Sequence, residues 1–87
     1  MRQDIKEIGL AVIARAPFHI YYEGSAEAIT AVNKVGKFDI LPGHADFFSI
    51  LEPGEIIIET ATDPINFNIT NGIITVRDNE VFLFVNI

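Results

Sequence analysis

Hydrophobic and polar residues alternate along much of the chain, in short runs separated by turn-forming residues. The clearest run spans residues 65–70, where Ile65, Phe67 and Ile69 occupy alternate positions and Asn or Thr fills the positions between them. A period of two residues is typical of a β-strand that is buried on one face only. Residues 55–60 are rich in isoleucine and also predict a strand.

Pairs of turn-forming residues divide the chain at intervals of about ten residues, a spacing typical of many short strands. These pairs are Glu23-Gly24, Val35-Gly36, Pro42-Gly43, Pro53-Gly54, Asp63-Pro64, Asn71-Gly72 and Asp78-Asn79. The nearest helical candidate is residues 25–32, because its alanines and Glu27 could begin a helix, but its β-branched residues favour a strand.

The last third of the chain carries the sharpest local prediction. Asn71-Gly72 lies between two apolar runs and supplies the positive φ angles of a two-residue type I′ hairpin. Asp78-Asn79 is a second pair of turn-forming residues between two apolar runs. We therefore expect a three-stranded meander made of residues 65–70, 73–77 and 80–85.

An all-β fold follows, and one open sheet could not cover its apolar face alone. We expect a two-sheet β-sandwich, or flattened barrel, of about eight to ten short strands. Residues 9–87 would form this single domain, and residues 1–8 a loose leader. Residues 8–16 loosely imitate a signal peptide, but the apolar run has only seven residues, and Asp4 and Glu7 neutralise the preceding basic residues. A first strand is the preferred interpretation.

Composition and charge exclude several classes of function, and they say less about the fold. With 87 residues, 49% of them hydrophobic and 21% charged, the chain is the size of one small globular domain. The net charge of −6 and the scattered basic residues disfavour binding to nucleic acid. The absence of cysteine excludes disulfides, thiolate metal sites and thiol nucleophiles, and favours an intracellular location. The apolar runs fall far short of the ~20 residues that cross a bilayer.

Candidate catalytic groups are few. His44, Asp46 and Ser49 lie within six residues of one another, and closeness in sequence is not the geometry of a triad. His44 and Asp46 would share one face of a strand and could hold a cation, but no third ligand accompanies them. Glu52 and Glu55 flank the Pro53-Gly54 turn, where we expect them to be solvated. We therefore predict no catalytic residue, no cofactor and no metal site.

Aromatic pairs suggest a different kind of site. Neighbouring residues on a strand point to opposite faces, so one member of Tyr21/Tyr22 and one of Phe47/Phe48 should lie outside the core. Two interpretations remain open, an interface on a partner or aromatic residues half covered at a sheet edge.

Three separated motifs resemble one known family, the N-terminal β-sandwich domain of the epsilon subunit of F-type ATP synthase. Residues 36–45, GKFDILPGHA, are similar to its Gly-x-x-Gly-Ile-Leu-Pro-Gly-His-Ala segment, and residues 51–54, LEPG, to its Leu-x-Pro-Gly turn. Residues 71–81 resemble its Gly-Gly-x-Leu-Glu-Val-x-x-Asn-x-Val stretch. Pro17 and Glu23-Gly24 resemble the residues that close its first hairpin. The resemblance covers about residues 10–87.

The chain also departs from the family pattern. Asp39 replaces a glycine, Asp46 a proline, and Val32 a proline that often ends the third strand. Lys37 stands where the family tends to have an acidic residue, so the resemblance implies a complementary change in the partner or a weaker contact there. In most members a helical hairpin follows the last strand. The sequence ends at Ile87, so we expect no C-terminal hairpin, and the inhibition and ATP binding of that hairpin are not assigned.

The resemblance implies a non-catalytic subunit of the rotor, or central stalk. Such a subunit links the gamma subunit to the membrane c ring and supports the coupling of proton or other ion transport to ATP synthesis. It is peripheral, on the cytoplasmic face of the cell membrane. By the same resemblance the c ring would be contacted by Lys37, Leu41, Pro42, Gly43 and His44, and the structural turns would be formed by Pro53, Gly54, Asn71 and Gly72.

One alternative belongs to another functional class. A free-standing β-sandwich module on the same scaffold would bind a ligand or a protein, with Tyr21, Tyr22, Phe47 and Phe48 lining a small-molecule site.

Overall fold

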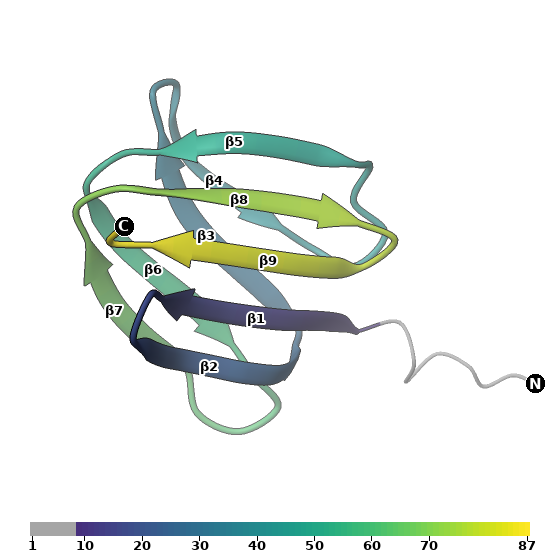
Figure 1. The fold of residues 1–87 in the computed structure, drawn as a ribbon. Coiled ribbons are helices and arrows are strands. Elements are labelled where there is room, and N and C mark those ends of the chain that lie inside the picture. Colours follow the sequence, from purple (N-terminus) through teal and green to yellow (C-terminus); the bar gives the residue numbers. More distant parts are fainter. Residues whose placement is uncertain (1–8) are drawn as a thin grey trace, which may run out of the picture.

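Nine β-strands form a two-layer sandwich in the computed structural model, which describes residues 9–87 (Figure 1). The strands are β1 (Leu10–Ala16), β2 (His19–Ala26), β3 (Ala28–Asn33), β4 (Gly36–Ile40), β5 (Phe47–Leu51), β6 (Gly54–Glu59), β7 (Ile65–Ile69), β8 (Gly72–Arg77) and β9 (Glu80–Val85). Among the described residues there is no helix long and apolar enough to cross a membrane. The expected leader, residues 1–8, lies outside the described residues.

The two layers differ in strand number. One sheet has five strands in the order β2-β1-β9-β8-β5, and the other has four in the order β4-β3-β6-β7. β1 and β9 pair in parallel, whereas the other pairs are antiparallel. The predicted two-sheet β-sandwich is confirmed, and residues 25–32 form no helix, since they belong to the end of β2, a bend at Glu27 and β3. The boundaries of the domain stay a prediction.

The core lies between the two sheets and consists of alternate residues from their strands. In the five-stranded sheet, Ile74 pairs with Leu83, and both side chains are fully buried. In the four-stranded sheet, Ile29 pairs with Ile58, also fully buried. Burial of each such side chain contributes about 1.5–3 kcal/mol relative to exposure. The apolar side chains at every second position therefore form the contact between the two layers.

The predicted meander is wrong in one strand. β7 pairs with β6 in the four-stranded sheet, whereas β8 pairs with β9 and β5 in the other sheet. Asn71-Gly72 is consequently a crossing between layers and not a hairpin turn. The second turn is confirmed, because Asp78 and Asn79 have φ angles of 51° and 63° and join β8 to β9.

Gly72 is required for a reason other than its φ angle. A Cβ atom on Gly72 would lie 2.8 Å from Val85 Cγ1 and 3.0 Å from the Phe84 carbonyl oxygen. The chain crosses between layers against the end of β9, and only glycine allows this approach. An Asn-Gly pair between apolar runs can therefore form a hairpin turn or allow a close approach to another strand, and the local sequence does not distinguish these two roles.

The turn expected at Glu23-Gly24 is also wrong, because both residues lie inside β2. The β1–β2 hairpin turns at Pro17-Phe18 instead. Gly24, at φ 155°, lies under the Tyr22 ring, whose hydroxyl would be 3.1 Å from a Cβ at that position. The glycine serves this close approach rather than a turn.

A β-bulge explains why the Tyr21/Tyr22 prediction is wrong. Ala14 pairs with Tyr22 but the next residue, Arg15, pairs with Ile20, so Tyr21 is the extra residue on β2. A bulge interrupts the strict alternation of faces. As a result both tyrosines pack against the core.

We expect Gly72→Ala to lower the free energy of unfolding by about 1–3 kcal/mol, because the new methyl group overlaps β9. Gly54→Ala is the matched control, since a Cβ there meets Val32 Cγ2 at an ordinary 3.4 Å. Urea unfolding of the two variants measures the difference. Equal stability of both variants would contradict the close approach at Gly72.

Candidate docking surfaces

Two rows of mostly apolar residues lie on the outer face of the five-stranded sheet. One row of paired residues runs Ile20, Arg15, Phe84, Ile73 and Ile50, from β2 to β5. The next row runs Ile13, Phe82, Thr75 and Phe48, from β1 to β5, and on β2 it ends in the charged Glu23 beside Ile13. We call the nine residues other than Glu23 the apolar face. Its most exposed members are on the edge strand β5, where Phe48 is 61% and Ile50 66% exposed.

The outer face of the four-stranded sheet is polar by comparison. Thr30 on β3 donates a hydrogen bond to Asp39 on β4 at 2.7 Å. Asn66 on β7 donates to Glu55 on β6 at 3.1 Å. These side chains satisfy one another across strands and remain exposed to water. The two outer faces therefore differ in chemistry, although both belong to one sandwich.

The apolar face has no covering layer within residues 9–87. A largely apolar surface on the outer face of a sheet is costly in water and is typical of a protein docking site. Aromatic residues enriched in such a surface are typical of interfaces, and Phe48, Phe82 and Phe84 supply them here. Phe82 and Phe84 stack on one another with ring centroids 6.0 Å apart.

Sequence reasoning identified only Phe48 of this face, through the Phe47/Phe48 pair. That prediction is confirmed, because Phe47 packs against the core and Phe48 is exposed. A further signal was available, since residues 81–85, VFLFV, are apolar at every position. A strand without polar alternation is typical of burial on both faces.

Four of the five predicted partner-binding residues, 41–44, form a tight turn. Residues 41–44 form a type II turn, in which the His44 N–H donates to the Leu41 carbonyl at 3.1 Å and Gly43 has a φ of 85°. Leu41 is 55% exposed at this turn. The His44 ring lies edge-on to Phe47, at 5.4 Å between ring centroids, and its Nδ1 lies 2.8 Å from the Ala45 carbonyl oxygen.

Lys37 does not belong to this turn. Residues 36–40 form β4, so Lys37 lies beside the β3–β4 turn and residues 41–44 follow the other end of the strand (Figure 1). Lys37 and Leu41 are four positions apart along an extended chain, a distance of about 13 Å. The five predicted partner-binding residues therefore do not lie on one loop, and the contacts themselves stay a prediction.

The other singled-out residues are also placed. Pro53 lies in the bend between β5 and β6, and Gly54 begins β6. His44 and Asp46 precede β5 and do not share a strand face. The Ser49 hydroxyl accepts from Asn33 Nδ2 and donates to the Ile50 carbonyl, both at 3.1 Å. Within residues 9–87, no group of three potential metal ligands occurs.

The aromatic residues of the small-molecule alternative do not line one site. Tyr21 and Tyr22 lie on β2, and Phe47 and Phe48 lie on β5, which are the opposite edges of the five-stranded sheet. Tyr21 instead stacks on Phe67 of β7, with ring centroids 4.1 Å apart.

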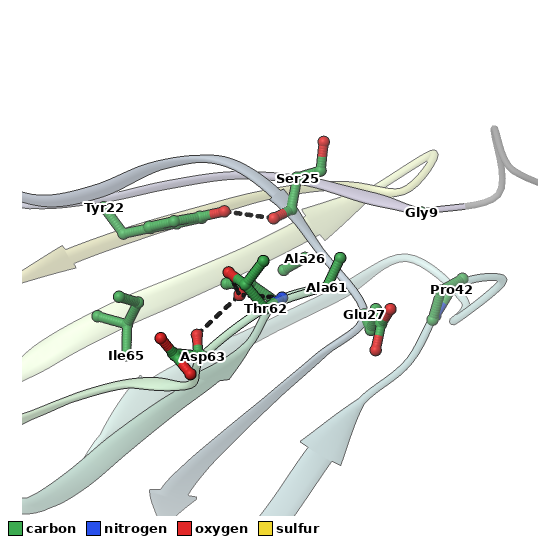
Figure 2. Close-up of a pocket in the computed structure, with 11 residues that line it drawn as sticks. Gly9, Tyr22, Ser25, Ala26, Glu27, Pro42, Ala61, Thr62, Asp63 and Ile65 are labelled. Atoms are coloured by element: carbon green, nitrogen blue, oxygen red, sulfur yellow. Dashed lines mark hydrogen bonds between the residues drawn. The ribbon is translucent and has the colours of Figure 1, made fainter.

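A cleft of about 840 Å³ opens between β2 and the loop before β7 (Figure 2). Tyr22 forms one wall, and its hydroxyl donates to the Ser25 carbonyl. On the other wall the Thr60 hydroxyl donates to the Asp63 carbonyl at 2.7 Å and accepts from the Thr62 N–H at 3.2 Å. These polar groups therefore already have hydrogen-bond partners within the walls of the cleft. Sequence reasoning did not find this cleft, because it depends on the packing of two sheet edges.

Comparison with known proteins identifies relatives of the domain. Residues 10–87 match the family model described as "ATP synthase, Delta/Epsilon chain, beta-sandwich domain". The ATP synthase epsilon chain of Ruthia magnifica subsp. Calyptogena magnifica is 35% identical over 63 residues, which are 72% of this chain and 46% of the relative. The epsilon chain of Trichlorobacter lovleyi is 28% identical over 69 residues, which are 79% of this chain and 50% of the relative. The chain thus spans about half the length of the curated relatives that it matches.

Solved structures share the fold. A chain of the Euglena gracilis mitochondrial ATP synthase, solved as OSCP/F1/c-ring, superposes with a TM-score of 0.82 at 20% identity, covering 90% of this chain and 51% of that one. A chain of the Tetrahymena thermophila mitochondrial ATP synthase, solved as central stalk and c ring, gives a TM-score of 0.75 at 23% identity. There the match covers 87% of this chain and 62% of that one.

The apolar face should contribute little to folding. We expect Ile74→Ala, at a fully buried position, to lower the free energy of unfolding by about 2–5 kcal/mol. We expect the same substitution at Ile50, which is 66% exposed, to lower it by less than about 1 kcal/mol. Chemical denaturation of both variants gives the comparison. A cost at Ile50 as large as that at Ile74 would assign the apolar face to stability instead of docking.

Proposed function

Because the chain belongs to the family of ATP synthase delta/epsilon β-sandwich domains, which it matches over residues 10–87, we propose that it is a non-catalytic subunit of the rotor. It links the gamma subunit to the membrane c ring in the central stalk. It thereby supports the coupling of ion translocation to ATP synthesis. Its position is peripheral, on the cytoplasmic face of the cell membrane.

One observation supports this proposal above others, the presence of an apolar outer face on one sheet only. We assign the apolar face to the gamma subunit. The polar face of the other sheet remains in water, because its side chains already bond one another. A domain of this size covers a modest fraction of its own surface, so burial of the apolar face by a partner would also stabilise it.

The contact with the c ring is assigned to residues 41–44 at one end of the sandwich. Loops at the end of a rigid sandwich present their side chains in fixed positions, and a packed core transmits force without large deformation. Lys37 makes a second, separate contact, because β4 lies between it and the turn.

The apolar face is tested by replacing one isoleucine on each sheet. We expect Ile50→Ser to weaken binding to the gamma subunit of the same organism about tenfold, a loss that corresponds to about 1.4 kcal/mol of buried apolar contact. Ile57→Ser is the control, since Ile57 lies among polar residues on the outer face of the four-stranded sheet, beside Thr30 and Asn66. Calorimetry on folded variants measures both affinities. A larger loss for Ile57→Ser would place the gamma subunit on the other sheet.

The charge at Lys37 is tested by its dependence on salt. We expect Lys37→Glu to weaken association with the c ring more at low salt than at high salt, because a direct pair of opposite charges is screened. Lys34→Glu, in the adjoining turn, makes the same change in net charge and serves as the control. Surface-based binding assays at two salt concentrations provide the measurement. An equal effect of the two variants would point to net charge and not to a pair at Lys37.

A further inference from the structure

The β8–β9 turn holds the loop that follows β4. The Oδ1 atom of Asn79 accepts a hydrogen bond from the Gly43 N–H at 2.7 Å, although the two residues are 36 positions apart in sequence. The backbone carbonyl of the same residue accepts from the Ala11 N–H at 2.8 Å. Asn79 therefore joins the start of β1, the loop between β4 and β5, and its own hairpin.

The backbone conformation of Asn79 suits it to this position. Its φ angle of 63° is left-handed, a region that asparagine adopts more readily than other side chains except glycine. Its short amide projects from the tight turn and meets Gly43. Asp78 has a similar φ of 51° but is exposed, and within residues 9–87 its side chain makes no hydrogen bond of this kind.

Residues 41–46 need such a support because they lie outside the strands. The type II turn bonds to itself through His44 N–H and the Leu41 carbonyl, which sets its shape but not its direction. The bond from Gly43 to Asn79 ties the turn to β8 and β9, which are paired along their full length inside the five-stranded sheet, and acts beside the edge-on contact of His44 with Phe47.

We propose that Asn79 is a positioning residue, which holds the turn of residues 41–44 in the orientation that docks on the c ring. This inference rests on the proposed rotor function. The residue acts through Gly43 and not by touching the ring. Holding the turn before docking reduces the conformational entropy that is lost on binding, and so strengthens association.

Three variants of the 87-residue chain test the role of Asn79. Asn79→Gly keeps the left-handed turn and removes the acceptor, whereas Asn79→Asp keeps an acceptor oxygen. Asp78→Gly changes the neighbouring turn residue and leaves the bond intact. We expect the Gly43 amide to exchange its hydrogen about 3- to 10-fold faster in Asn79→Gly, as for loss of one hydrogen bond of ordinary strength. Asn79→Asp and Asp78→Gly should match the original chain. NMR hydrogen exchange gives this measurement.

The second measurement is binding of the same variants to the purified c ring and, separately, to the gamma subunit. We expect Asn79→Gly to weaken ring association about 3- to 10-fold, with recovery in Asn79→Asp, and to leave gamma affinity unchanged. Unchanged Gly43 exchange, or unchanged ring association despite faster exchange, would overturn the role of Asn79. A parallel loss of gamma affinity would also overturn it, in favour of general destabilisation. If the original chain binds neither gamma nor the ring, the proposed function itself fails.

Discussion

The mutual burial of the two inner sheet faces is the constraint on which the rest of the structure depends. Each sheet contributes alternate aliphatic residues, such as Ile74 and Leu83 on one side and Ile29 and Ile58 on the other. Neither sheet could remain exposed, since the apolar area is too large for water. This requirement overrides local turn preferences, and it explains why the chain crosses between layers at Gly72 instead of forming a hairpin there.

The same constraint leaves the apolar face of the five-stranded sheet uncovered. The four-stranded sheet is apolar inside and mostly polar outside, although Ile57 lies on its outer face. The strands of the five-stranded sheet are apolar on both faces in places, as in β9, and the sandwich covers only one of these faces. Under the proposed rotor function this asymmetry would have a use, because the subunit would bind a partner with one outer face and leave the other in water.

The ends of the sandwich carry its second kind of surface. Loops there are free of ladder hydrogen bonds, and their direction has to be set by single contacts. The bond between Gly43 and Asn79 is such a contact, and the separation of Lys37 from residues 41–44 by β4 is another result of the same geometry. Lys37 and Leu41 are close in sequence but lie near opposite ends of β4, whereas Gly43 and Asn79 are 36 positions apart and form a hydrogen bond.

Local pattern alone determined the strand class, most strand positions, the Asp78-Asn79 hairpin and the inner faces, because alternation and turn chemistry act over a few residues. The motif of residues 36–45 also indicated the family. Tertiary structure decided the partner of each strand, the bulge at Tyr21, the apolar face and the tie between Asn79 and Gly43. A strand with an apolar face fits several neighbours equally well, so its place depends on which arrangement lets both sheets bury their inner faces together.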